Sequence, residues 1–275
     1  EDYARKADLR SILALLQGND GGADQEVMTL KEAIEKSEYE VAYKIITSGV
    51  DLDEVDEKNN MTLLMWFCFT VNIDAVKYLV NRRVNISFQE GVIGNSAIGL
   101  LIERGYYNLR GKSLNTVIDI LTVLTKGNVD LDAVVDAHGN TALNLVCKQP
   151  DFEGLNSKMV DVLIDNDVNL DFPDFEGLTP MMSFAKYNER ELNLNIIEAL
   201  IDEEADVSHI DKYGNTVLSY AAMNSKDSDA KKIAELVLDV DSSLALVVNN
   251  EGKSPLDLAI ESGNEGCAKV ILMNM

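Results

Sequence analysis

The sequence has few of the residues that most catalytic and metal sites use. Its 275 residues include only two histidines, His138 and His209, which lie far apart in the sequence without evident partner residues. A metal site or a general base needs several such groups close together. The patterns His-Glu-x-x-His, Cys-x-x-Cys and Gly-x-Ser-x-Gly are also missing. We therefore expect no enzyme activity, no metal, no cofactor and no small-molecule substrate.

Long apolar runs are absent as well. No stretch approaches the roughly 18 uninterrupted apolar residues of a transmembrane helix, so the sequence predicts no membrane insertion. Cys68, Cys147 and Cys267 are odd in number and widely spaced, which argues against a disulfide framework. Each lies among apolar residues, so we expect buried, reduced thiols and a cytoplasmic protein.

Positive charge is scarce relative to negative charge. The chain carries 24 basic and 47 acidic residues, for a net charge of -23. Such a surface repels phosphate backbones and anionic lipids, which disfavours nucleic acid as a partner. It favours a protein partner that carries a basic patch. The alternative interpretation is that the acidic residues simply cover solvated helix faces.

One short pattern recurs along the chain. A turn that contains Gly or Asn is followed by Thr or Ser and then by an apolar run. The hydroxyl residues are Thr62, Ser96, Thr141, Thr179, Thr216 and Ser254. They follow one another at intervals of 34 to 45 residues, and a weaker copy places Met28 at the corresponding position. The pattern indicates a repeated unit of about 34 residues with insertions.

Each copy predicts the same local structure. Gly or Asn permits the left-handed backbone of a tight turn, and the hydroxyl then caps a helix. Pro180 and Pro255 follow the hydroxyl at the first helical position, where proline is tolerated. A second helix and an alternating tail, such as Val168-Asn169-Leu170, predict a helix pair followed by a short hairpin. One such unit cannot bury its own apolar face, so neighbouring units must stack.

These residues resemble the ankyrin repeat. The segment Asp174-Phe175-Glu176-Gly177-Leu178-Thr179-Pro180-Met181 matches the opening of that repeat, and Ala205-Asp206-Val207-Ser208 matches its close. The resemblance covers roughly residues 25–275. It implies an all-α solenoid of stacked helix–turn–helix repeats with short β-hairpin connections. The expected units are 25–56, 57–90, 91–135, 136–173, 174–210, 211–248 and 249–275, about seven in all, after an N-terminal capping helix and loop at 1–24.

The sequence departs from the family pattern at one polar position. The usual histidine of the first helix is replaced in successive copies by Lys31, Met65, Gly99, Asn144, Met182, Ser219 and Asp257. The polar network that this histidine normally forms between repeats is therefore not expected. Apolar stacking must then contribute more.

The resemblance implies a protein–protein interaction scaffold or adaptor. Partners in this family meet the hairpin tips and the concave face of the first helices. The matching candidate residues here are Met61, Phe69, Val92, Ile93, His138, Phe175, Leu178, Tyr187, Tyr213 and Met223. The alternative is that these side chains pack on the adjacent repeat. Two other functions stay open, a structural segment of a larger cytoskeletal or filament assembly and the recognition module of a longer enzyme or effector.

Overall fold

The computed structural model describes residues 30–35, 45, 51–55, 60–89, 94–109, 112–127, 129–187, 193–224 and 226–275. From residue 60 onward these residues form consecutive helix pairs. The pairs are α4 (Leu63–Phe69) with α5 (Ile73–Val80), α6 (Ala97–Arg104) with α7 (Asn115–Thr125), α8 (Ala142–Lys148) with α9 (Leu155–Ile164), α10 (Pro180–Tyr187) with α11 (Asn195–Asp202), α12 (Val217–Met223) with α13 (Asp227–Val240), and α14 (Pro255–Glu261) with α15 (Glu265–Asn274). Helix α2 (Leu30–Glu35) precedes them, and the short helices η1 (Gly105–Asn108) and η2 (Ser242–Leu246) follow α6 and α13.

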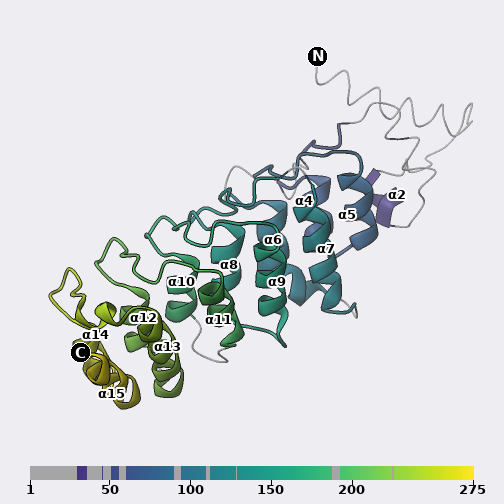
Figure 1. Cartoon of the computed structure of the whole chain (residues 1–275). Helices are drawn as coiled ribbons and strands as arrows, with labels where there is room; N and C mark the ends of the chain where they lie inside the picture. Colours follow the sequence, from purple (N-terminus) through teal and green to yellow (C-terminus); the bar gives the residue numbers. More distant parts are fainter. Residues whose placement is uncertain are drawn as a thin grey trace, which may run out of the picture.

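The pairs stack side by side into an elongated array (Figure 1). The first helices pack in succession, α4 on α6, α6 on α8, α8 on α10, α10 on α12 and α12 on α14. Most second helices form a parallel row in the same way, α5 on α7, α7 on α9 and α9 on α11. Because each pair contacts mainly its neighbours, the fold is a solenoid. The predicted all-α solenoid of stacked helix pairs is confirmed.

The predicted repeat boundaries can be compared with these pairs. Each expected unit from 57–90 to 249–275 contains one helix pair in the described residues. Of the first unit, 25–56, the structure describes α2, Ile45 and residues 51–55. The expected capping helix and loop at 1–24 lie outside the described residues. The total of seven repeats stays a prediction.

Hydroxyl caps begin the first helices, as the recurring pattern predicts. The side-chain oxygens of Thr62, Ser96, Thr141, Thr216 and Ser254 each accept a hydrogen bond from the backbone N–H three residues later. This bond satisfies one of the N–H groups that a helix start leaves without a partner. The hydroxyl residues that recur in the sequence are therefore the residues that begin the first helices.

The hairpins are tight loops in this structure. Gln89 and Ser96 form an isolated antiparallel bridge, and no strand is present in the described residues. The loops before α8, α10, α12 and α14 are closed by the bonds Val135 N–H to Asn140 O, Asp174 N–H to Leu178 O, Asp211 N–H to Asn215 O and Asn249 N–H to Lys253 O. We call these four loops the fingers and number them by their first helix. Finger 8 is residues 135–140, finger 10 is 174–178, finger 12 is 211–215 and finger 14 is 249–253.

Buried amide side chains join the helices where the sequence alone gives no clear signal. The Asn264 side chain donates to the carbonyls of Ala222 and Asn224, each at 2.7 Å. The Asn144 side chain donates to Phe172 O at 2.7 Å, near the end of its own unit, 136–173. Asn144 stands where the family has its histidine, so an asparagine supplies a polar link here between the first helix and the segment that leads to finger 10. Polar bonds therefore accompany the larger contribution of apolar stacking that the sequence predicts.

All three cysteines are buried, free thiols in the apolar core, as the sequence predicts. Burial raises the pKa of the Cys68 and Cys147 thiols well above the ordinary range. Burial, aided by the nearby Asp227 carboxylate, raises the pKa of Cys267 to about 12. Since the thiolate is the reactive form, these groups are protected both sterically and by their protonation.

We expect native thiols to react very slowly with an alkylating reagent. At pH 8 a thiol of pKa about 12 is roughly 10⁻⁴ ionised, whereas an ordinary cysteine is about one quarter ionised. Alkylation of the native chain should therefore be at least about 1,000-fold slower than that of free cysteine. In denaturant all three thiols should react at the ordinary rate. Mass spectrometry of the labelled chain measures both, and rapid labelling of any native cysteine would contradict the buried placement.

Candidate protein-binding surface

The four fingers share one hydrogen-bonding device. The side-chain oxygen of an Asp or Asn near the start of each finger accepts two backbone N–H groups, two and four residues later. These oxygens belong to Asp136, Asp174, Asp211 and Asn249, and the bonds are 2.8–3.0 Å long. Asp and Asn favour such local turns because their side chains mimic a backbone acceptor. The device holds the finger backbone, and so fixes the positions from which the tip side chains project.

Neighbouring fingers are also bonded to one another. The Phe175 N–H donates to His138 O at 3.1 Å, and the Asn250 N–H donates to Tyr213 O at 2.9 Å. The Lys212 ammonium donates to Phe175 O, and the Asn250 side chain donates to Lys212 O at 3.0 Å. The fingers therefore form a continuous row that needs little ordering when a partner binds.

Several predicted site residues are exposed on this row or beside it. The exposed fraction is 62% for Phe175, 54% for Tyr213, 41% for Tyr187 and 37% for Met223. The His138 side chain is 81% exposed. Phe175 and Tyr213 occupy adjacent fingers, and the Phe175 ring lies against Gly139 of the preceding finger. The structure therefore places two aromatic side chains and His138 along three consecutive fingers.

The predicted exposure of Leu178 is wrong, because its side chain is completely buried. It follows the left-handed Gly177, where the finger turns back toward the core, so it packs beneath the finger and is not on its surface. Met61 and Phe69 are half-buried, and the Phe69 ring lies 6.0 Å from that of Trp66. Val92 and Ile93 lie outside the described residues.

A group of lysines and tyrosines lies where the first helices end. Lys148 and Lys186 place their ammonium groups 5.3 and 5.1 Å from the Tyr187 ring centre. Lys186 also lies 5.2 Å from the Tyr220 ring centre. These distances are within the range of cation–π attraction. The aromatic surface at Tyr187 is therefore bordered by positive charge in a chain that is acidic overall.

Each of these lysines also pairs with a carboxylate of finger 10. Lys148 lies 2.8 Å from the buried Asp174, and Lys186 lies 3.0 Å from Glu176. Burial opposes the charged form of Lys186, but hydrogen bonds to Glu176 and Tyr187 outweigh it and raise its pKa. Lys186 is therefore charged at neutral pH, and both pairs connect a helix end to the finger that carries Phe175.

A buried phenol supports the next finger. The Tyr220 hydroxyl of α12 donates to the Asp211 carboxylate, which also accepts the Tyr213 N–H at 2.8 Å. Burial and this bond raise the pKa of Tyr220. Neither Tyr220 nor Asp211 stands out in the sequence as a site residue, although the regular spacing of Asp136, Asp174, Asp211 and Asn249 is a signal for the finger device.

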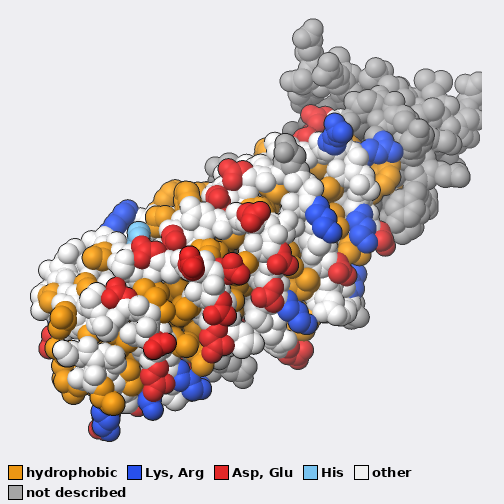
Figure 2. Space-filling view, in the orientation of Figure 1, with side chains coloured by type: hydrophobic (Ala, Val, Ile, Leu, Met, Phe, Trp, Pro, Cys, Tyr) orange, Lys and Arg blue, Asp and Glu red, His pale blue; other side chains and the backbone are white. Residues whose placement is uncertain are grey.

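The described residues were also searched for metal sites and for membrane-spanning helices. Among them, no three His, Cys, Asp or Glu side chains gather closely enough to hold a metal ion. None of the described helices has the length and apolar character needed to cross a bilayer. Figure 2 shows acidic side chains along the described array, with apolar side chains between them toward the C-terminal end. The surface in view is therefore suited to polar and apolar contacts with another macromolecule.

Comparison with known proteins agrees with this architecture. The family model "Ankyrin repeats (3 copies)" matches residues 152–244 and 190–275. The ankyrin repeat protein FPV031 of fowlpox virus is 28% identical over 136 residues, which are 50% of this chain and 35% of that protein. The palmitoyltransferase AKR1 of Lachancea kluyveri is 24% identical over 205 residues, 74% of this chain and 26% of that protein. The chain thus spans about a third or less of these two curated relatives.

A solved structure shows the same fold. The ankyrin repeat domain of Bcl-3, a member of the IkappaB family, superposes with a TM-score of 0.67 at 18% sequence identity. The superposition covers 92% of this chain and 100% of that domain. Ankyrin repeats are in general protein-interaction modules. The fold alone names no partner, which must be inferred from the surface.

Proposed function

Because this chain is an ankyrin-repeat protein, we propose that it is a non-catalytic scaffold or adaptor that binds another protein through its fingers and first-helix ends. The observation that carries the proposal is the exposure of Phe175, Tyr213 and Tyr187 around a hydrogen-bonded row of fingers. Large aromatic side chains on a rigid surface commonly contribute most of the energy of an interface. Exposed apolar groups that lie close together also mark interaction sites.

The net charge and the buried thiols support proposals for the charge of the partner and for the location of the protein. A net charge of -23 favours a partner with a basic patch, whose association should slow as salt increases. Three buried thiols in separate repeats suit a reducing compartment, which supports the proposal of a cytoplasmic protein. At Tyr187 the partner would present apolar groups, because Lys148 and Lys186 are already paired with Asp174 and Glu176.

Binding by a triple variant tests the surface. With a partner obtained by affinity capture from native extract, Phe175→Ala/Tyr187→Ala/Tyr213→Ala should weaken binding by at least about 100-fold, because interface aromatics often cost 2 kcal/mol or more each. Isothermal titration calorimetry measures the affinity. Circular dichroism should show unchanged helix content, because the three side chains are largely exposed.

The matched control removes exposed apolar side chains elsewhere. Leu272→Ala/Met273→Ala truncates residues that are 57% and 86% exposed on the second helix α15, outside the fingers and the first-helix ends. Its affinity should stay within about 2-fold of the original. Equal binding by the triple variant and the original chain would overturn the assignment of this surface.

A second candidate function is recognition within a longer enzyme. It is favoured by the similarity to palmitoyltransferase AKR1, which extends over 74% of this chain but only 26% of that protein. In this case the array would select a protein substrate or regulator for a catalytic domain outside these 275 residues. A coding sequence that continues into a catalytic domain would favour this function over an independent adaptor.

A further inference from the structure

The row of second helices is interrupted between α11 and α13. Helix α9 packs on α11, and α13 packs extensively on α15 and α12, but α11 makes no comparable contact with α13. The first helices α10 and α12 of the same two repeats do pack together. Helix α13 has 14 residues, whereas α11 has eight. The array is therefore continuous through its first helices and opens on the side of its second helices.

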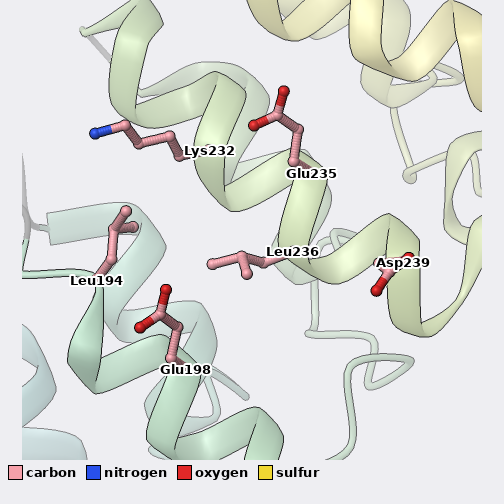
Figure 3. A pocket seen from close by; sticks show the side chains of 6 residues that line it. All are labelled: Leu194, Glu198, Lys232, Glu235, Leu236 and Asp239. Atoms are coloured by element: carbon pink, nitrogen blue, oxygen red, sulfur yellow. The ribbon is translucent and has the colours of Figure 1, made fainter.

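A groove of about 430 Å³ occupies this opening. It is lined by Leu194, Glu198, Lys232, Glu235, Leu236 and Asp239. Figure 3 shows that Leu236 of α13 projects toward α11 and that Glu198 of α11 projects into the space between the helices. Leu194, immediately before α11, faces the same space. Leu194 and Leu236 thus form an apolar part of the groove, one on each side of it.

The apolar and charged side chains of the groove differ in burial. Leu194 and Leu236 are half-buried and pack against the core, which leaves part of each side chain accessible from the groove. Glu198, Lys232, Glu235 and Asp239 are exposed. Glu235 lies 3.5 Å from Lys231 on the same helix, and both of these side chains are half-exposed. Such an exposed pair is weak and can be exchanged for a pair with another cation.

Charge decides what kind of segment fits the groove. The lining carries three carboxylates and one ammonium group, within a chain whose net charge is -23. An apolar side chain between Leu194 and Leu236 would remove their accessible surface from water, which is favourable. Lysine or arginine on either side would meet Glu198 and Asp239. An acidic segment would be repelled by the same residues.

We propose that the groove between α11 and α13 is a second docking site, which binds a basic amphipathic segment of a partner protein. The segment places an apolar side chain between Leu194 and Leu236 and directs its cations to Glu198, Glu235 and Asp239. The site lies on the row of second helices, so it does not depend on the finger surface. Two partners, or two parts of one partner, then bind the same array on different faces.

A designed peptide tests this proposal directly. The probe is a fluorescently labelled Lys/Leu amphipathic helix of about 15 residues, long enough to fold on binding. Its affinity for the full chain is measured by fluorescence anisotropy at physiological salt. Peptides in which Glu replaces Lys, or Ser replaces Leu, report the charge and apolar contributions. Both should bind at least about 10-fold more weakly than the Lys/Leu peptide.

Two groove variants locate the binding site. Glu198→Lys/Asp239→Lys should weaken the Lys/Leu peptide by at least about 10-fold. Leu236→Ser leaves the net charge unchanged and should weaken it by about 5- to 10-fold through lost apolar contact. The matched control, Asp119→Lys/Asp161→Lys, reverses two exposed carboxylates on α7 and α9 and should change the affinity by less than about 2-fold.

The outcomes separate docking from general charge attraction. An equal loss in the groove and control double variants would show non-specific attraction and overturn the proposal. Unchanged binding by Leu236→Ser, or no binding of the peptide to the original chain, would overturn it as well. Circular dichroism establishes that each variant is folded, and Glu198→Lys/Asp239→Lys alters only exposed side chains. The triple finger variant should bind this peptide as the original chain does, which distinguishes the two sites.

Discussion

Replacing Gly214 with alanine is expected to lower the free energy of unfolding by about 2–5 kcal/mol, whereas the same change at Gly252 should cost only about 1–2 kcal/mol. The two glycines have nearly the same left-handed backbone, with φ of 79° and 77°. A methyl group at Gly214 would lie 2.7 Å from Asn250 N and 3.0 Å from Asn249 Cα of the next finger. A methyl group at Gly252 would meet nothing within 4 Å.

The difference between these two variants isolates the contact between fingers. Backbone strain is common to both, so the additional loss at Gly214 measures the close approach of finger 14 to finger 12. Urea denaturation followed by circular dichroism gives both free energies. Equal losses at the two positions would mean that fingers 12 and 14 are not in close contact, and the proposed binding surface would lose its rigid support.

Replacing Asp174 with alanine should lower the free energy of unfolding by about 3–5 kcal/mol. The Asp174 side chain is 1% exposed and pairs with Lys148 at 2.8 Å, and the Lys148 side chain is only 16% exposed. Its other oxygen accepts the N–H groups of Glu176 and Leu178. Alanine would leave the lysine without its anion and the finger backbone without its acceptor, and each of these losses is costly.

Asp174→Asn separates these two losses. Asparagine can accept the same backbone N–H groups, as Asn249 does in finger 14. Only the charge opposite Lys148 is then removed, so we expect a smaller loss of about 1–3 kcal/mol. Thermal and urea unfolding of the two variants rank the effects. If Asn were as destabilising as Ala, the backbone bonds of the finger would contribute little, contrary to our description.

The repeat architecture could be predicted because its signals are local. The hydroxyl of Thr141, the turn at Gly139 and the proline at 255 each act within a few residues, and the structure uses them as caps, turns and helix starts. Their recurrence at a regular interval then leaves stacking as the means of burying the apolar faces. These local signals can be recognised in the sequence even where its identity to relatives is low.

The candidate surface could be predicted only in part, because exposure depends on the direction of a side chain at a turn. Phe175 and Tyr213 lie at finger tips, and they are exposed as expected. Leu178 is just beyond the turn and is buried, although its place in the pattern is only three residues from Phe175. Periodicity gives no guidance within so short a loop, where one left-handed glycine reverses the chain.

Features that depend on contacts between residues far apart in the sequence were not predictable from local patterns. The bond from Asn144 to Phe172 O joins residues 28 positions apart, and those from Asn264 join residues about 40 apart. The groove between α11 and α13 lies where two second helices of consecutive repeats do not pack on one another. These arrangements depend on how far neighbouring repeats approach one another, which composition and spacing do not specify.

Site-specific photocrosslinking shows directly which surface of the array meets the partner. A benzophenone amino acid is placed at Tyr213, which is exposed on finger 12, or at Asp161, which is exposed on helix α9. The two chains are expressed in native cells and irradiated. We expect a discrete crosslinked partner from position 213 and none of the same mass from position 161. The same crosslink from both positions, or from position 161 alone, would contradict the assignment of the fingers as the binding surface.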